Sequence, residues 1–219
     1  MDVWRLTWFT LACAAAATAL ALPVGVSIAW LLARGRFRGR TVVEALVTLP
    51  LVMPPVATGL ILLMLLGRRG AIGRLLERAG VDVVFTWKAV VLAMAVMGLP
   101  LLVRTVRAGF EHVDRRYEQV AATLGAPPLR AFLTVSLPLA WPSVVAGAVL
   151  AFARAIGEFG ATVVVAGSIP GATRTLAVAI YTYSETGQDA QALTLVAISI
   201  AIGFVALLFS NTLAGRRAA

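Results

Sequence analysis

Two ionisable side chains, Arg154 and Glu158, interrupt an otherwise apolar stretch of the sequence. Residues four apart lie on the same face of a helix, so the two can form an ion pair. Because charge is costly inside a membrane, such a pair is expected to face protein or water. One interpretation is a gate in which Arg154 attracts a dianion, and the other is a salt bridge that holds helices or a dimer together. We favour the salt bridge, because a carboxylate on the path repels an anion.

The patterns of several common enzyme sites do not occur in the sequence. It contains no Gly-x-x-x-x-Gly-Lys-Ser/Thr phosphate loop, no Gly-x-Ser-x-Gly, no paired cysteines and no His-Glu-x-x-His. The single cysteine, Cys13, lies in an apolar run, and the single histidine, His112, lies among charged residues. We therefore expect no catalytic residues, no metal site and no cofactor bound by this chain, and any ATP hydrolysis would need a separate subunit.

The composition is typical of a membrane protein. Hydrophobic residues make up 60% of the 219-residue chain and charged residues 13%, whereas soluble domains carry about 25% charged residues. The net charge of +9 could indicate nucleic-acid binding in a soluble protein. Here the arginines lie mostly between apolar runs and form no basic stripe with aromatic residues, so we expect a lipid membrane and no nucleic acid as the partner.

Five apolar runs are long enough to cross a bilayer, which needs about 20 residues in a helix. They predict an all-α, polytopic membrane helical bundle formed by a single domain over residues 1–219. The segment 166–187 is apolar but short, and it is expected to be a re-entrant or surface helix, with a sixth span as the alternative. The five runs are 7–33, 42–66, 88–108, 137–165 and 190–213.

The basic residues favour an N-terminus outside and a C-terminus in the cytoplasm, because cytoplasmic loops carry an excess of Lys and Arg. With that orientation 11 of the 19 basic residues are inside and 7 outside, and Arg154 lies in a span. The inside set is Arg34, Arg36, Arg38, Arg40, Arg104, Arg107, Arg115, Arg116, Arg130, Arg216 and Arg217. The outside set is Arg5, Arg68, Arg69, Arg74, Arg78, Lys88 and Arg174. The basic segment 68–78 is predicted to be a short amphipathic helix on the outer surface.

Three prolines, Pro50, Pro54 and Pro55, lie inside the second apolar run. Each removes an internal hydrogen bond and kinks a helix. Within lipid this is tolerated where neighbouring groups or a water-filled cavity satisfy the freed carbonyls. Two interpretations stay open: the helix lines a pathway, or the kink serves packing alone.

Residues 109–136 form a polar island between two apolar runs, on the cytoplasmic side in this orientation. The stretch around 115–124 is predicted to be a short helix, and Gly125 allows a sharp exit at its end. Pro127 and Pro128 suit the first turn of a second short helix with an apolar face. Two such helices at an angle would suit docking into a groove of another protein.

This island resembles the signature of the permease subunits of binding-protein-dependent ATP-binding-cassette importers. That signature is Glu-Ala-Ala, three residues, Gly, nine residues, then Ile-x-Leu-Pro. Here nine residues follow Gly125 and precede "VSLP", residues 135–138. The Glu-Ala-Ala places hold Gln119, Val120 and Ala121, and the glutamate, Glu118, lies one residue earlier. We therefore expect Gly125 and the shape of the loop to matter more than the carboxylate.

The resemblance covers essentially the whole chain. The stretches "LPLVMPPVATG" and "LAFARAIGEFGATVVVAGSIPGATRTLAVAIY" are similar to permeases of molybdate importers, with sulfate/thiosulfate and tungstate importers as alternatives. The resemblance implies a homodimer in the bacterial inner membrane, a cytoplasmic ATPase subunit that uses ATP, and an external oxyanion-binding protein. It also implies an ATPase-coupling loop that contains Glu118, Gln119, Ala121, Ala122, Gly125, Ala126, Pro127, Leu137 and Pro138.

A path for a dianion is expected to offer weak, neutral contacts, apart from any charged gate. Polarity and position in the apolar runs select the candidates for the path or gate. These are Thr48, Pro54, Thr58, Ser143, Arg154, Glu158, Thr162 and Ser168.

Overall fold

The computed structural model describes residues 2–35 and 37–215, so Arg36, Arg216 and Arg217 of the charge count lie outside the described residues. Every regular element among the described residues is a helix, which confirms the all-α prediction. In chain order they are α1 (Val3–Arg34), α2 (Arg40–Val52), α3 (Pro55–Leu66), α4 (Ala71–Arg78), α5 (Trp87–His112), α6 (Arg115–Thr123), α7 (Pro128–Ala131), the π-helix η1 (Phe132–Ser136), α8 (Leu137–Ile156), α9 (Gly160–Ala166), α10 (Leu176–Glu185) and α11 (Asp189–Gly215).

Four continuous helices are long and apolar enough to cross a membrane: α1, α5, the run from α7 through α8, and α11. The pair α2 and α3 makes a fifth candidate, bent by 113° at its break. At about 1.5 Å per residue, α10 with its ten residues cannot cross a 30 Å hydrocarbon core. The described residues therefore supply four or five candidate spans and no sixth.

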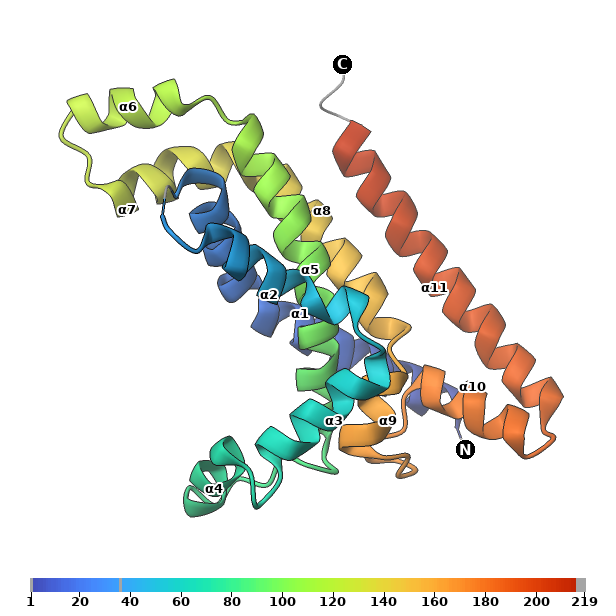
Figure 1. Ribbon diagram of the computed structural model, residues 1–219. Coiled ribbons are helices and arrows are strands. Elements are labelled where there is room, and N and C mark those ends of the chain that lie inside the picture. Colours follow the sequence, from blue (N-terminus) through green and yellow to red (C-terminus); the bar gives the residue numbers. More distant parts are fainter. Residues whose placement is uncertain (1, 36, 216–219) are drawn as a thin grey trace.

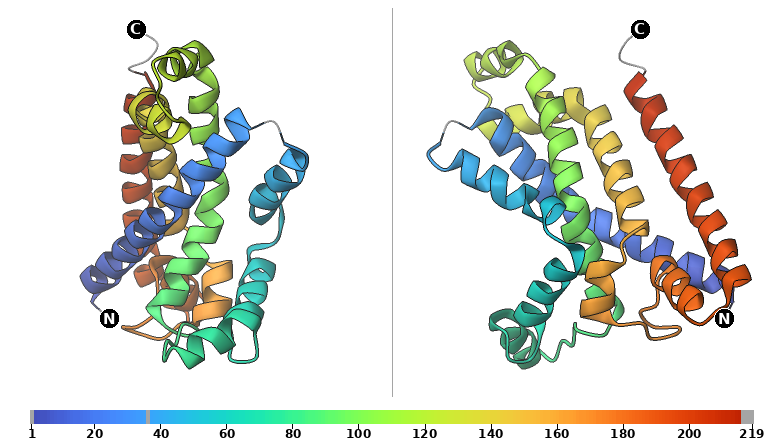
Figure 2. Two further views of the ribbon diagram at one scale, coloured as in Figure 1. Left: turned by 90° about the vertical axis from the view of Figure 1, so that its left-hand side faces the viewer. Right: turned by 45° about the vertical axis from the view of Figure 1, so that its right-hand side comes forward.

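Helix α5 is the centre of the bundle and packs against α1 and α8 (Figure 2). Its inward face carries fully buried apolar side chains, among them Val90, Met94, Leu102 and Phe110. Much of the remaining core is alanine, for example Ala14 and Ala29 of α1 and Ala140 and Ala155 of α8. These small side chains allow close helix packing, which is one source of attraction between helices in lipid.

The two ends of the bundle differ (Figure 1). One end carries α6, α7, the end of α1 and the end of α11, and we call it the α6 end. The other carries α4, α10 and the beginning of α1, where the amide of Leu176 donates to Thr10 Oγ1 at 2.9 Å. The predicted amphipathic helix is α4, with Ile72 and Leu75 exposed and Leu76 packed on the core.

The predicted continuous span 137–165 is wrong in its second half. Helix α8 ends at Ile156, and α9 starts separately at Gly160. The carboxylate of Glu158 accepts from the amide of Ala161 at 2.8 Å, so a side chain replaces a helical carbonyl as the partner of that amide. The fourth span is therefore the continuous run Pro128–Ile156, and α9 follows it as a separate short helix.

Candidate functional site

The break between α2 and α3 lies close to the interruption between α8 and α9, at a contact between α3 and α9 that we call the junction (Figure 1). A Cβ atom on Gly59 of α3 would lie 2.7 Å from the carbonyl oxygen of Ala161. A Cβ atom on Gly160 of α9 would lie 2.8 Å from Pro55 Cβ. The backbones of the two helices therefore touch at positions where only glycine fits.

The break between α2 and α3 has a local cause. Met53 and Pro54 each precede a proline, which disfavours helical backbone, and both are extended, with ψ 145° and 131°. Pro55 then starts the new helix at a position that suits proline. The last turn of α2 closes with the amide of Met53 donating to the carbonyl of Leu49 at 3.0 Å. The predicted kink is confirmed at Pro54 and Pro55, where the chain turns by 113°, whereas Pro50 lies inside α2.

Arg154 and Glu158 form the predicted ion pair, with 2.8 Å between Arg154 Nη2 and Glu158 Oε2. The side chain of Glu158 is 1% exposed and that of Arg154 is 27% exposed. The second carboxylate oxygen accepts from the amide of Ala161. The expectation that both residues lie on one helix is wrong, because Glu158 follows the end of α8. The pair instead ties the end of α8 to the first turn of α9.

Two threonines of the predicted path lie at the junction. Thr58 of α3 is 6% exposed and Thr162 of α9 is 0% exposed. Each is the chain neighbour of a residue in the close contact, Gly59 or Ala161. Neither hydroxyl has a hydrogen-bond partner among the described residues, and an unpaired buried hydroxyl costs about 1–3 kcal/mol. The junction therefore holds two polar groups whose hydrogen-bonding capacity is unused.

The other path candidates are spread along the bundle. Pro54 is exposed and caps α3 at the break. Thr48, one turn before the break, donates to the carbonyl of Glu44 at 2.8 Å. Ser143 lines a cavity of about 930 Å³ at the α6 end. Ser168 accepts from Arg174 Nε at 3.0 Å in the loop before α10. The structure thus gathers Pro54, Thr58, Arg154, Glu158 and Thr162 near the junction and places Thr48, Ser143 and Ser168 elsewhere.

The predicted loop 109–136 begins in the last turn of α5 and contains α6, the turn at Gly125, α7 and η1. Asp114 caps α6 by accepting from the amide of Arg116 at 2.9 Å. At its other end Gly125 has φ +82°. The amides of Gly125 and Ala126 donate to the carbonyls of Ala122 and Ala121, both at 3.0 Å. This paired closure is the Schellman motif, which confirms the predicted glycine turn.

The second short helix of the loop is not separate from the fourth span. Pro127 caps α7 and Pro128 is its first residue, as predicted. The helix then runs without a break through η1 into α8, whose first residues are Leu137 and Pro138. In a π-helix each backbone hydrogen bond spans five residues instead of four, so the chain stays hydrogen-bonded through η1. The π-helix therefore joins α7 to α8, two segments that the sequence suggests as separate.

Helix α6 has an outer and an inner face. Tyr117, Val120 and Leu124 are exposed by 58%, 58% and 83%, while Glu118 and Ala121 turn inward and are half-buried. Gln119 and Ala122 are exposed, and Ala126 is half-buried. The outer face is thus an apolar surface that no described element covers.

Glu118 has partners inside the chain that its sequence position does not indicate. Its Oε1 atom accepts from Arg34 Nε at 2.8 Å and from Ser136 Oγ at 2.6 Å. Arg34 and Ser136 were not among the predicted site residues. Their separations of 84 and 18 residues from Glu118 leave no periodic signal in the sequence.

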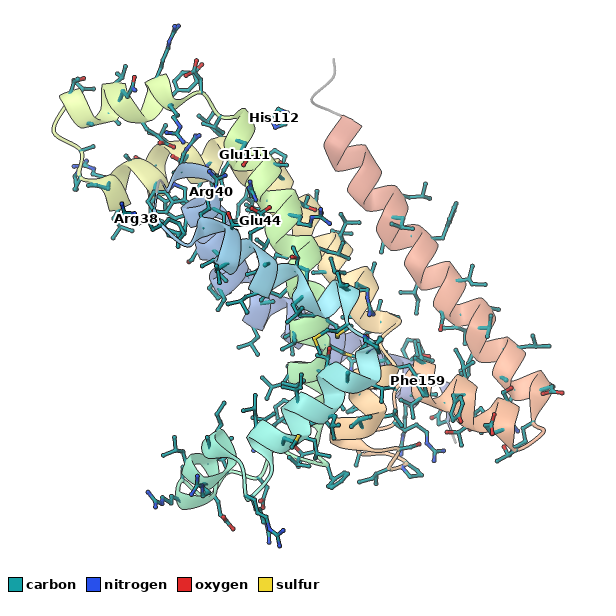
Figure 3. The ribbon with its side chains drawn as sticks, viewed as in Figure 1. Arg38, Arg40, Glu44, Glu111, His112 and Phe159 are labelled. Atoms are coloured by element: carbon teal, nitrogen blue, oxygen red, sulfur yellow. The ribbon has the colours of Figure 1, made fainter. Side chains whose placement is uncertain are left out.

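A second group of charges joins the beginning of α2 to the last turns of α5, and Figure 3 labels three of its members. Arg107 Nη1 lies 2.6 Å from Glu44 Oε1, and Arg107 Nε lies 2.8 Å from Glu111 Oε1. Arg40 Nη2 lies 3.7 Å from the same Glu111 oxygen. Sequence reasoning counted these arginines only for topology and did not pair them.

Several curated proteins are similar to this chain over most of its length. The molybdenum transport system permease protein ModB of Escherichia coli K12 is 46% identical over 213 residues, 96% of this chain and 93% of its own. The ModB of Mycobacterium tuberculosis is 48% identical over 195 residues, 89% of this chain and 72% of its own. The sulfate transport system permease protein CysT of Salmonella typhimurium is 36% identical over 192 residues, 88% of this chain and 69% of its own.

Solved transporters share the fold at low sequence identity. A chain of the inward-facing MetNI methionine ABC transporter matches with a TM-score of 0.65 and 18% identity, over 96% of this chain and 94% of its own. A chain of a bacterial alginate ABC transporter matches with a TM-score of 0.71 and 16% identity, over 97% of this chain and 78% of its own. A family model, the binding-protein-dependent transport system inner membrane component, matches residues 21–218. The chain therefore belongs to the inner-membrane components of binding-protein-dependent transport systems, a family of multi-pass, non-catalytic permease subunits of ABC transporters.

Proposed function

We propose that this chain is the permease subunit of an ATP-driven molybdate importer. The similarity to ModB permeases along 96% of the chain carries the proposal. The subunit acts as a homodimer with a separate ATPase, which uses the ATP, and with an external binding protein, which delivers the oxyanion. The lower identity to a sulfate permease supports molybdate over sulfate as the substrate.

The α6 end lies in the cytoplasm and the N-terminus lies outside. The excess of basic residues on that side of the predicted spans supports this orientation. It also agrees with an odd number of crossings, since α1 begins at one end of the bundle and α11 ends at the other (Figure 1).

The outer face of α6 docks on the ATPase subunit. Tyr117, Val120 and Leu124 are large, exposed and apolar, and the helix that carries them lies beyond the candidate spans. Apolar side chains at i, i+3 and i+7 are the anchors of a helix that lies in a groove of a partner. The open space around Gly125 leaves room for that partner to approach the turn.

The substrate passes the membrane beside the junction. Broken helices at membrane depth are tolerated where the irregular backbone is buried in protein or lines a cavity, and transporters place binding sites at such breaks. The hydroxyls of Thr58 and Thr162 supply neutral donors for an oxyanion once α3 and α9 separate. The Arg154–Glu158 pair ties α8 to α9 beside this path, which supports the structural salt bridge over the gate.

Uptake by the reconstituted transporter tests the substrate. Liposomes that contain the permease, the ATPase and the binding protein should accumulate labelled molybdate when ATP is present. Excess unlabelled molybdate should abolish that uptake, tungstate should compete in part, and sulfate should leave it unchanged. Faster uptake of labelled sulfate or tungstate than of molybdate would contradict the proposed substrate.

Docking is tested by co-purification with the ATPase. Leu124→Ser removes the most exposed apolar side chain of this outer face, at the residue that follows α6, and should reduce the amount of ATPase recovered. Leu75→Ser, at an exposed leucine on α4 at the opposite end, is the matched control and should leave recovery unchanged. Equal recovery with both variants would exclude docking through this face.

A further inference from the structure

The inner face of α6 is fastened to two other helices through one carboxylate oxygen. Glu118 Oε1 accepts both from Arg34 at the end of α1 and from Ser136 at the end of η1. The side chain of Arg34 is 10% exposed, that of Glu118 is 23% exposed, and Ser136 is 0% exposed. Hydrogen bonds to an ionised group are among the stronger ones in proteins, and partial burial protects them from competition by water.

Backbone contacts reinforce the same connection. Arg34 Nη2 donates to the carbonyl of Val113, the residue that follows α5, at 2.7 Å. In return Arg115, the first residue of α6, donates from Nη2 to the carbonyl of Ala33 at 3.2 Å. The end of α1 and the beginning of α6 therefore hold each other from both sides.

The hydroxyl of Ser136 has an unusual partner for this chain. Many helical hydroxyls here donate to the carbonyl four residues earlier, as Ser27 and Thr134 do. Ser136 donates to Glu118 instead, at the point where the π-helix passes into α8. Single π-helical turns are frequent at functional sites, and this one is tied to α6 by a side chain.

We propose that Arg34, Glu118 and Ser136 form a latch that transmits movement of α6 to α1 and α8. This inference rests on the proposed docking of the outer face of α6 on the ATPase. Without the latch, α6 is joined to its neighbours by the chain at Val113–Asp114, by the open turn at Gly125, by packing on α7 and η1, and by the one hydrogen bond from Arg115 to the carbonyl of Ala33. With it, a displacement of α6 pulls on the ends of two spans, one of which leads to the junction. Glu118 is thus a positioning residue whose partners are inside the permease.

The test uses the complete transporter in liposomes, with Glu118→Gln, Arg34→Gln and the double variant. The measurements are recovery of the ATPase, ATP hydrolysis with and without molybdate-loaded binding protein, and molybdate transported per ATP. We expect normal recovery and normal unstimulated hydrolysis. Stimulation should fall by about fivefold or more, at the lower end of typical coupling between sites. The double variant should lose no more than either single variant, because the two side chains act as one unit.

Two further variants test the latch with a smaller change and provide a matched control. Ser136→Ala deletes one hydrogen bond and no charge, so it should insert normally and lose part of the stimulation. Glu77→Gln makes the same acid-to-amide change in an exposed pair on α4 and should behave as wild type.

Three results would overturn the latch: full stimulation in Glu118→Gln and Ser136→Ala, additive losses in the double variant, or loss of ATPase recovery in Glu118→Gln. The last would make Glu118 a docking residue. A wild-type transporter that molybdate-loaded binding protein does not stimulate would count against the proposed function itself.

Discussion

The junction and the α6 loop are held together in different ways. At the junction the backbones of α3 and α9 touch at Gly59 and Gly160, and a buried ion pair fixes the end of α8. The α6 loop instead has open space around Gly125, an uncovered apolar face and hydrogen bonds between charged side chains. The junction depends on close backbone packing and one buried ion pair, whereas the loop depends on a few more exposed contacts.

This difference predicts where substitutions affect stability and where they affect coupling. Close-packed interiors respond even to one added methyl group. An exposed loop tolerates such changes unless they remove a specific hydrogen bond or force an unfavourable backbone angle. Substitutions at the junction should therefore destabilise the permease, and substitutions in the loop should leave it folded and alter its response to the ATPase.

The largest effect on stability is expected for Arg154→Ala. Removal of one partner from a buried pair costs roughly 3–5 kcal/mol, because the remaining charge is left buried without compensation. We expect the lower part of this range, since Arg154 is 27% exposed. The measurement is thermal unfolding of the purified permease in detergent. Arg104→Ala, at an exposed arginine on α5, is the control, and equal stability of the two variants would show that the pair does not hold the junction.

The next effect concerns the contact between α3 and α9. Gly59→Ala places a methyl group 2.7 Å from a backbone oxygen of Ala161 that cannot move aside cheaply. Overpacking of this kind costs about 1–3 kcal/mol. Gly203→Ala on α11 makes the same change where nothing lies within 4 Å and should stabilise by about 0.5–1 kcal/mol. In thermal unfolding, Gly59→Ala should lower the melting temperature and Gly203→Ala should raise it. A higher melting temperature for Gly59→Ala would contradict the tight contact.

Some features of both regions follow from local sequence, and others do not. The prolines at 54 and 55 predict the break in the second span, and Gly125 predicts the turn after α6, because each acts on its own backbone. The break after α8 was missed, since "ARAIGEFGATVVV" is almost as apolar as a continuous span and the capping by Glu158 depends on its side-chain conformation. The partners of Glu118 were missed because tertiary packing alone brings Arg34 to it.

A smaller effect on stability is expected at Gly125, where the φ angle of +82° is unfavourable for residues with a side chain. Gly125→Val should cost about 1–2 kcal/mol of local strain and abolish stimulation of the ATPase while insertion stays normal. Gly125→Asn should lose less, because asparagine tolerates this conformation better. ATP hydrolysis by the reconstituted transporter separates the two variants. Normal stimulation with valine would show that the shape of this turn is not needed for coupling.

The smallest effect is expected for Glu44→Gln, which tests whether the charge group between α2 and α5 belongs with the loop or with the junction. Glu44 contacts Arg107 at 2.6 Å, but its side chain is 44% exposed and Arg107 keeps Glu111 as a second partner. Exposed pairs contribute about 0.2–1 kcal/mol and weaken in salt. Thermal unfolding should therefore show a small loss at low salt that shrinks at high salt. A loss as large as that of Arg154→Ala, and insensitive to salt, would place this group with the buried contacts that hold the junction together.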